Sequence, residues 1–224
     1  TPHVLAAVGS PVDASAATAH GTLGAVEAVL DKDLNDARPG RALVHGCGAV
    51  GGTVAHHLVE HGWTVFTVDL DREKASVPGA TPLPDSCAWW ELNLDLLLPC
   101  SISGLINAEM ATALKTPAVV PAANAPFQQP QLADDLRRRG VRVLPDPLVN
   151  AGAVIADSIE RFSPDAWKDA GAKAVYAFVR DEVRRRASEY LNQREQGLSV
   201  GAALEEVAAT PSTEPIGLSF GESE

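Results

Sequence analysis

The 224-residue sequence has few of the features that would stabilise a protein without a large apolar core. It has only three cysteines, Cys47, Cys87 and Cys100, and their spacing is irregular. We therefore expect neither a disulfide framework nor a zinc site. Free thiols are typical of a reducing compartment, so we expect a cytoplasmic protein. Hydrophobic residues make up 46% of the chain, which is enough for a buried core at this length.

Positive charge is also scarce. The chain has 18 Lys and Arg against 29 Asp and Glu, for a formal net charge of −11. Phosphate backbones and anionic membranes are bound through Lys and Arg, so this balance argues against nucleic acid or a membrane as the main partner. No apolar run approaches the roughly 18 residues that a bilayer requires. The composition thus favours an acidic globular protein.

Short apolar segments alternate with helical ones over the first two thirds of the chain. Strands are predicted at 41–45, 64–70, 94–98, 118–122 and 141–144, and helices at 12–33, 53–61, 107–114 and 128–139. Strands that are apolar on both faces and alternate with helices form parallel sheets covered on both sides. The fold class expected is therefore α/β, with a doubly wound, mostly parallel, Rossmann-like sheet.

A glycine-rich turn follows the first predicted strand. Residues 46–51 (GCGAVG) match G-x-G-x-x-G, and a second strand ends in Asp69. In this pattern Gly46 allows the tight turn, Gly48 lets the backbone approach a diphosphate, and Gly51 permits close helix–strand packing. The following helix presents N–H groups to the phosphates. The candidate dinucleotide-binding residues here are Gly46, Gly48, Ala49, Val50, Gly51, Asp69 and Leu70. The alternative is an ordinary strand–helix turn without a ligand.

The acid after the second strand also bears on the choice of cofactor. Asp69 would accept hydrogen bonds from the adenine ribose and repel a 2′-phosphate, which favours NAD over NADP. Arg72 could weaken that preference. We expect residues 1–162 to form a dinucleotide-binding domain that begins with a leading helix in 1–33. Residues 163–208 are predicted to be C-terminal helices packed on it, with one long helix over 164–193. Polar, Pro-containing residues 209–224 are predicted to be a flexible tail.

Four further segments make the assignment more specific. They are residues 15–21 (SAATAHG), 98–104 (LPCSISG), 122–124 (AAN) and 145–152 (PDPLVNAG). In order and approximate spacing they resemble the S-x-x-T-A-x-G, P-C-A-L-G-G, G-A-A-N-N and P-D-Y-V-V-N-A-G-G segments of the glutamate/leucine/phenylalanine/valine dehydrogenases. The resemblance implies the NAD-binding domain of an amino-acid dehydrogenase. Such an enzyme deaminates an L-amino acid reversibly to a 2-oxo acid and transfers the hydride to NAD.

The resemblance also implies further cofactor contacts, at Thr18, Cys100, Ser101, Ala123, Asn124 and Asn150. Of these, Thr18 and Asn150 would lie near the nicotinamide. For Cys100, a small buried apolar side chain is an equally good interpretation. For Asn150, a helix N-cap is the alternative, and one side chain could serve both purposes.

Substrate contacts are expected at Asn124, Val154 and Asp157. Asp157 falls where members of the family line the side-chain pocket, and a carboxylate there would suit a cationic or hydrogen-bonding side chain. The alternative is an i, i+4 ion pair with Arg161. Ala125 replaces the second Asn of the family's paired asparagines, which removes one polar group near the substrate.

The catalytic lysines of the family are not matched. In the family two lysines and an aspartate on an N-terminal domain bind substrate and transfer protons, and the five lysines here, Lys32, Lys74, Lys115, Lys168 and Lys173, lie in no such segment. We therefore expect no catalytic residue in this chain and a catalytic domain upstream of it, with a homo-oligomer possible. The rival interpretation is a non-catalytic NAD-binding or regulatory module, and a third is another Rossmann enzyme.

Three other features have interpretations that need no ligand. The histidines His45, His56, His57 and His61 lack a Cys or carboxylate at ligand spacing, so we expect surface helix residues and no metal. The basic run 184–186 is expected to be a solvated face. The pair Trp89-Trp90 is either an exposed loop pair or a core anchor.

Overall fold

The computed structural model describes residues 12–32, 39–84, 86–163, 165, 167 and 170–210. The predicted tail lies outside these residues from position 211 onward. The chain divides into two compact units. Among the described residues, 12–29 and 151–210 belong to one, here called the helical unit, and those within 30–150 belong to the other, here called the sheet unit.

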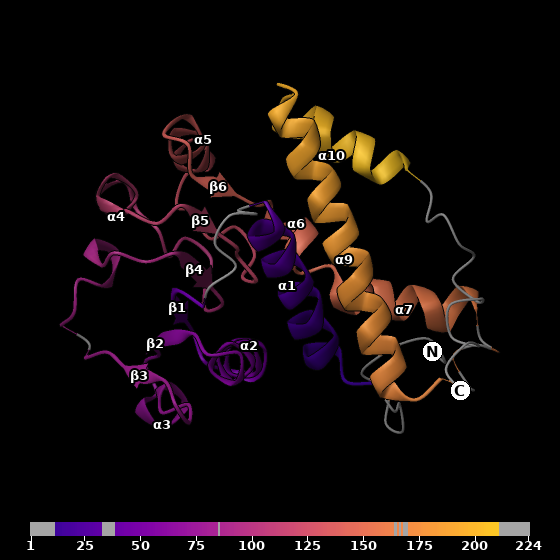
Figure 1. The fold of residues 1–224 in the computed structure, drawn as a ribbon, viewed down its shortest axis with the longest axis horizontal. Coiled ribbons are helices and arrows are strands. Elements are labelled where there is room, and N and C mark those ends of the chain that lie inside the picture. Colours follow the sequence, from indigo (N-terminus) through magenta and orange to yellow (C-terminus); the bar gives the residue numbers. More distant parts are fainter. Residues whose placement is uncertain are drawn as a thin grey trace. The chain divides into compact units, whose positions relative to one another are not determined.

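The sheet unit is built on six strands, all paired in parallel. They are β1 (Arg41–His45), β2 (Thr64–Val68), β3 (Thr81–Pro82), β4 (Leu96–Pro99), β5 (Ala118–Val119) and β6 (Arg142–Val143). Their order is β3-β2-β1-β4-β5-β6 (Figure 1). The predicted doubly wound Rossmann-like fold is confirmed. Because the chain order reverses between β1 and β4, the carboxyl ends of these strands form the crevice where such sheets bind ligands.

The central strands are buried on both faces, as their sequence predicts. Leu43 of β1 pairs in register with Phe66 of β2 and Leu97 of β4. Leu43 and Leu97 are fully buried and share a core cluster with Trp89, which is 5% exposed. Trp89 is therefore a core anchor, and its ring meets that of Trp90 edge to face.

Mostly short helices connect the strands of the sheet unit, and one more follows the last strand. They are α2 (Ala49–Glu60), α3 (Arg72–Ala75), the 3-10 turn η1 (Trp89–Glu91), α4 (Ala108–Ala113), α5 (Pro130–Arg138) and α6 (Asp146–Val149). Side chains fix two of the helix starts. Asp71 accepts the Glu73 N–H at the start of α3, and Asn107 accepts the Met110 N–H at the start of α4.

The helical unit contains α1 (Ala14–Asp31), α7 (Gly152–Phe162), α9 (Ala172–Glu195) and α10 (Val200–Ala209). A Cβ on Gly24 would lie 2.1 Å from the Arg180 carbonyl oxygen, and one on Gly152 would lie 2.1 Å from the Ala17 oxygen. Glycine at these two positions therefore lets α9 and α7 pack directly on the backbone of α1. None of the helices in the described parts of the chain could cross a bilayer, since none is both long and apolar enough.

The long C-terminal helix differs from its predicted bounds. Gly171 has extended backbone, with ψ 158°, and precedes the first residue of α9. The predicted helix over 164–193 therefore does not run unbroken through this position, because an extended residue ends the α-helical hydrogen-bond pattern. At the other end α9 continues to Glu195, two residues beyond the prediction.

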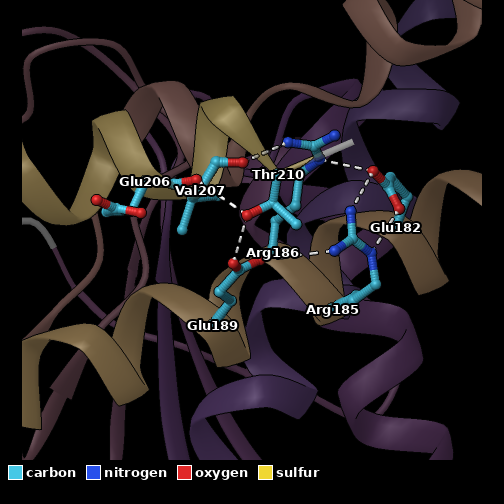
Figure 2. Close-up of polar contacts among 7 residues, drawn as sticks. All are labelled: Glu182, Arg185, Arg186, Glu189, Glu206, Val207 and Thr210. Carbon is cyan, nitrogen blue, oxygen red and sulfur yellow. Dashed lines mark hydrogen bonds and ion pairs between the residues drawn. The ribbon is translucent and has the colours of Figure 1, made fainter. Parts of the chain in front are cut away.

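The basic run on α9 is not a solvated face. Arg185 and Arg186 both donate to Glu182, whose side chain is 9% exposed. Arg186 also donates to the Val207 carbonyl at the end of α10, at 2.9 Å, and Thr210 Oγ1 donates to Glu189 at 2.7 Å (Figure 2). These contacts tie α10 to α9. The expectation of a solvated face is therefore wrong, since two of the three arginines satisfy a buried carboxylate.

Candidate functional site

The glycine turn between β1 and α2 has a rigid inner side and an open outer side. Gly46 has φ +93°, and a Cβ on it would lie 2.5 Å from Ser101 Cβ. A Cβ on Gly51 would lie 1.9 Å from the Gly46 oxygen. Apart from its chain neighbours Cys47 and Ala49, no described residue has an atom within 4 Å of a Cβ built on Gly48. The first and third glycines are therefore required by packing, whereas Gly48 borders free space.

Helix α2 begins directly behind this open position. Ala49 and Val50 form its first two residues, and Gly48 is its N-cap without a side-chain cap hydrogen bond. The first N–H groups of a helix have no partner within the helix, and the dipole adds partial positive charge there. The turn thus presents backbone donors to an anion in the manner of a phosphate-binding helix N-terminus.

The structure brings Asp69 to the mouth of the glycine turn. Its Oδ2 accepts the Cys47 N–H at 2.7 Å, and its Oδ1 accepts the Asp71 N–H at 2.9 Å. Burial alone would raise the pKa of Asp69, but these N–H groups, with Lys74 and His45 adding smaller effects, hold its pKa below the usual value. The carboxylate is therefore ionised and fixed beside the turn, with neutral backbone donors as its hydrogen-bond partners.

An open cavity of about 290 Å³ adjoins this carboxylate. Its lining residues are Asp69, Arg72, Ala75, Ser76, Pro82, Leu83 and Pro84. Two large apolar side chains are exposed in the turns that follow β2 and β4, the strands flanking β1: Leu70 is fully exposed and Ile102 is 64% exposed. Ile102 was not among the predicted residues, although its place three positions after a central strand was a usable signal. The cavity combines charged groups with an apolar wall, which suits a planar base attached to a sugar.

The carboxyl end of β4 forms the back of the turn. Cys100 donates its N–H to the His45 carbonyl at 2.7 Å, and its Cβ would lie 3.0 Å from a Cβ on Gly51. Burial raises the pKa of Cys100 to about 12 and that of Cys47 to about 11. Both thiols are therefore protonated near neutral pH and are poor nucleophiles. Cys100 packs behind the turn and is half-buried, so its part in cofactor contact stays a prediction.

One group at this edge was misjudged from the sequence. His45 is the last residue of β1, not a surface helix residue, and its Nδ1 lies 2.9 Å from Ser101 Oγ. Its ring meets Trp89 edge to face, and burial lowers its pKa while the charge of Asp69 opposes that shift. The signal was its position, because a polar residue at the end of the central strand faces the crevice edge. The other three histidines lie on or just after α2.

A second polar group lies at the ends of β5 and α6. Asn150 Nδ2 donates to Asn124 Oδ1 at 2.7 Å and to the Ala122 carbonyl at 3.3 Å. Ala123 donates its N–H to the Pro99 carbonyl and is nearly buried. The structure thus brings Asn124 and Asn150 together. Asn150 follows α6 as its C-cap, and the N-cap of α7 is the next residue, so the interpretation of Asn150 as an N-cap is wrong.

Backbone strain accompanies this group. Ala125 has φ +44°, in the left-handed region that is unfavourable for alanine and tolerated by Asn or Gly. The Asp146 carboxylate accepts the Ala125 N–H at 2.9 Å and supports the conformation. The position after Asn124 is therefore held in an uncommon conformation at the edge of the sheet.

Three predicted residues belong to the helical unit. Thr18 donates its hydroxyl to the Ala14 carbonyl of its own helix. Val154 is 68% exposed, and Asp157 is half-buried on α7. The alternative ion pair of Asp157 with Arg161 is not formed, and the Arg161 guanidinium lies over the Phe162 ring instead. The part of these residues in cofactor or substrate binding stays a prediction.

Comparison with known proteins adds independent evidence. The family model described as Glutamate/Leucine/Phenylalanine/Valine dehydrogenase matches residues 70–211. A valine dehydrogenase of Streptomyces albus is 35% identical over 134 residues, covering 54% of this chain and 37% of that protein. A phenylalanine dehydrogenase of Lysinibacillus sphaericus is 28% identical over 167 residues, covering 70% and 44%. The chain thus spans less than half the length of these relatives.

A solved structure shows the same fold. The crystal structure of L-tryptophan dehydrogenase from Nostoc punctiforme matches with a TM-score of 0.74 and 23% identity, covering 87% of this chain and 59% of that one. The family model covers well over half of the 224 residues, including the segments that follow β4, β5 and β6. The chain therefore belongs to the glutamate/leucine/phenylalanine/valine dehydrogenase family.

Proposed function

We propose that this chain is the NAD-binding portion of an amino-acid dehydrogenase that deaminates an L-amino acid reversibly to its 2-oxo acid. Family membership supports the reaction class, since the reported relatives are dehydrogenases of valine, phenylalanine and tryptophan. The single observation that carries the cofactor assignment is the contact between the Asp69 carboxylate and the Cys47 N–H. It fixes an anionic hydrogen-bond acceptor at the mouth of a glycine turn whose middle position is open.

Each part of the dinucleotide has a matching surface in the sheet unit. The diphosphate is assigned to Gly48 and the first N–H groups of α2, where the backbone is open to an approaching anion. The adenine ribose is assigned to Asp69, because a carboxylate bound by one N–H at each oxygen retains lone pairs for two sugar hydroxyls. The base is assigned to the adjoining cavity, and exposed Leu70 directly follows Asp69, one of the lining residues.

The negative charge of Asp69 at the mouth of the glycine turn favours NAD over NADP. Asp69 keeps its negative charge near neutral pH, and its hydrogen-bond donors are uncharged peptide groups. A 2′-phosphate placed at the same hydroxyls would meet that charge at close range. Arg72 lines the same cavity and reduces the penalty, so the preference for NAD is expected to be moderate.

The nicotinamide and the substrate are assigned to the other side of the crevice. Ser101 and Ala123 follow β4 and β5 on that side, and the hydrogen-bonded pair Asn124–Asn150 lies at the ends of β5 and α6. Thr18 is proposed as a nicotinamide contact on the family resemblance alone. Val154 and Asp157 of α7 are proposed to contact the side chain of the amino acid. Bound there, NAD would supply the acceptor for the hydride that leaves the substrate α-carbon. The proposed role of the residues of this chain is to orient the two reactants for that transfer.

Proton transfer is assigned to residues beyond this chain. Deamination needs a base that activates water and a cation that binds the substrate carboxylate. The lysines that supply these groups in the family have no match here, and the chain spans less than half the length of its relatives. We therefore propose an upstream catalytic domain as the partner that completes the active site.

Calorimetry with NAD, NADH, NADP and NADPH tests the assignment on this chain. We expect NAD to bind more tightly than NADP and the Asp69→Ala variant to lose about tenfold or more in NAD affinity, because a charge-assisted pair of hydrogen bonds is removed. Glu109→Gln removes one negative charge from exposed α4 and serves as the control. Absence of any heat of binding from the wild-type chain at millimolar dinucleotide would overturn the proposal.

A further inference from the structure

The carboxyl end of β1 carries a titratable side chain that the dinucleotide motif does not explain. His45 lies one residue before the glycine turn, with Nδ1 2.9 Å from Ser101 Oγ. Its ring centroid is 5.2 Å from that of Trp89, in an edge-to-face arrangement. The imidazole is thus held between a core tryptophan and a serine hydroxyl, and its orientation is fixed from two sides.

Ser101 connects this imidazole to the glycine turn. A Cβ on Gly46 would lie 2.5 Å from Ser101 Cβ, so the serine lies directly against the first glycine. The Cys100 N–H donates to the His45 carbonyl and fixes the backbone of this segment. Ser101 itself is exposed. The Ser101 hydroxyl therefore contacts His45 and lies at the solvent-exposed surface beside the glycine turn.

A hydroxyl bonded to an imidazole has two arrangements. When Nδ1 carries no proton, Ser101 donates its proton to His45 and offers only lone pairs to a ligand. When Nδ1 is protonated, His45 donates to Ser101 Oγ, and the hydroxyl proton becomes available to an anionic oxygen. The charged ring also adds a positive charge close to the turn. Protonation of His45 thus improves the match to a diphosphate in two ways.

The groups around His45 keep it neutral in the unliganded protein. Burial lowers the pKa of His45, and Asp69 at the end of β2 opposes this in part. The thiols of Cys47 and Cys100, which flank the pair along the chain, have raised pKa values of about 11 and 12 and carry no charge. Trp89, from η1, is uncharged. A bound diphosphate adds an anion to these surroundings and raises the histidine pKa.

We propose that His45 is a positioning residue for the cofactor diphosphate. In the unliganded chain it is the Nε2–H tautomer that accepts the Ser101 proton. On taking up a proton it reverses that hydrogen bond, turns Ser101 into a donor and makes dinucleotide affinity rise as the pH falls. This inference rests on the proposed function and assigns to that site a pH-dependent component.

The test measures NAD affinity of the whole chain by calorimetry between about pH 8 and about pH 5.5. We expect affinity to rise about threefold or more toward the lower pH, since one pKa unit of linkage corresponds to tenfold. His45→Gln retains a hydrogen-bonding amide that does not titrate, so its profile should be flat. His56→Gln alters an exposed histidine of α2 that pairs with Glu60, and this control should retain the wild-type slope.

Nitrogen and carbon NMR of labelled histidine gives a readout that a structural role would not change. We expect the Nε2–H tautomer of His45 in the free chain and a higher His45 pKa when NAD is saturating. Equal slopes for wild type and His45→Gln, or an unchanged His45 pKa on NAD binding, would overturn the inference and leave the proposed function intact. Absence of NAD binding at every pH would overturn both. If His45→Gln does not fold, the pKa of the wild-type residue decides.

Discussion

Two carboxylates of this molecule have lowered pKa values for different reasons. Asp69 in the sheet unit is held by two backbone N–H groups, whereas Glu182 in the helical unit is held by the guanidinium groups of Arg185 and Arg186. For both, burial alone would raise the pKa, and the hydrogen bonds outweigh it. Neutral donors leave Asp69 with its charge uncancelled, while Glu182 is neutralised by its partners. The first arrangement suits a ligand and the second suits a structural contact.

The largest expected effect on stability is at Glu182, the carboxylate that is paired with arginines. Glu182→Ala removes the shared partner of two partly buried arginines, and we expect it to lower the free energy of unfolding by about 2–4 kcal/mol. Urea denaturation measures this loss. NAD affinity at a temperature where the variant is folded should change less than about twofold. An effect below about 0.5 kcal/mol would show that Glu182 is no more than a surface ion pair.

Asp69, whose charge is not cancelled by a cation, should affect the selectivity between NAD and NADP more than it affects stability. We expect Asp69→Asn to shift the ratio of NADP to NAD affinity toward NADP by about tenfold, because the repulsive charge is removed. The hydrogen bond from the Cys47 N–H is retained, so the unfolding free energy should fall by about 1 kcal/mol or less. Competition calorimetry with both cofactors gives the ratio. An unchanged ratio would place the discrimination elsewhere, for example at Arg72.

Acid should affect the two carboxylates in the same direction. Both have pKa values lower in the folded than in the unfolded chain, so their stabilisation is present above the unfolded pKa near about 4 and is lost as the pH falls through the folded values. We expect a smaller loss of unfolding free energy between about pH 6 and about pH 3.5 for Glu182→Gln than for wild type. Denaturant titrations at each pH provide the comparison. A steeper loss in the variant would contradict the assignment.

The smallest effect on stability is expected at the glycine that borders open space. Gly48 has φ −69°, and a methyl group on it would meet no described residue within 4 Å other than its two chain neighbours. Gly48→Ala should therefore change the unfolding free energy by less than about 1 kcal/mol while weakening NAD binding, because the methyl group projects toward the proposed diphosphate. Gly51→Ala is the matched comparison and should be strongly destabilising. If Gly48→Ala kept the wild-type affinity for NAD, the assignment of the diphosphate to this position would be wrong.

The sequence predicts the centre of the sheet better than its edges. The pattern of 41–45 gives β1 with its observed bounds, since the three inner residues of this central strand are apolar and buried. Strand β3 is two exposed residues and carries no apolar pattern. Strands β5 and β6 are shorter than predicted, because pairing ends where the neighbouring strand ends, which a single segment does not reveal.

In the candidate site, the sequence likewise predicts the local features and misses the contacts between distant residues. The glycine turn and its acid are local patterns, so the sequence predicts that Asp69 lies at the turn. The contact of His45 with Ser101 joins residues 56 positions apart and leaves no periodic signal. Glu182 lies three and four residues before its arginines, so that network was visible as helical spacing. The hydrogen bond from Arg186 to the Val207 carbonyl depends on how α10 packs against α9, so the sequence does not reveal it.

The fully exposed leucine after Asp69 has a thermodynamic consequence. Leu70 follows Asp69, which lines the cavity that is assigned to the base, and Ile102 is exposed in the turn after β4. A ligand that covers these side chains removes hydrocarbon from water, and the heat capacity of the complex then falls below that of the separated molecules. The enthalpy of dinucleotide binding should accordingly become more negative as the temperature rises. The apolar surface that is exposed at this edge of the free protein would then contribute to the binding free energy.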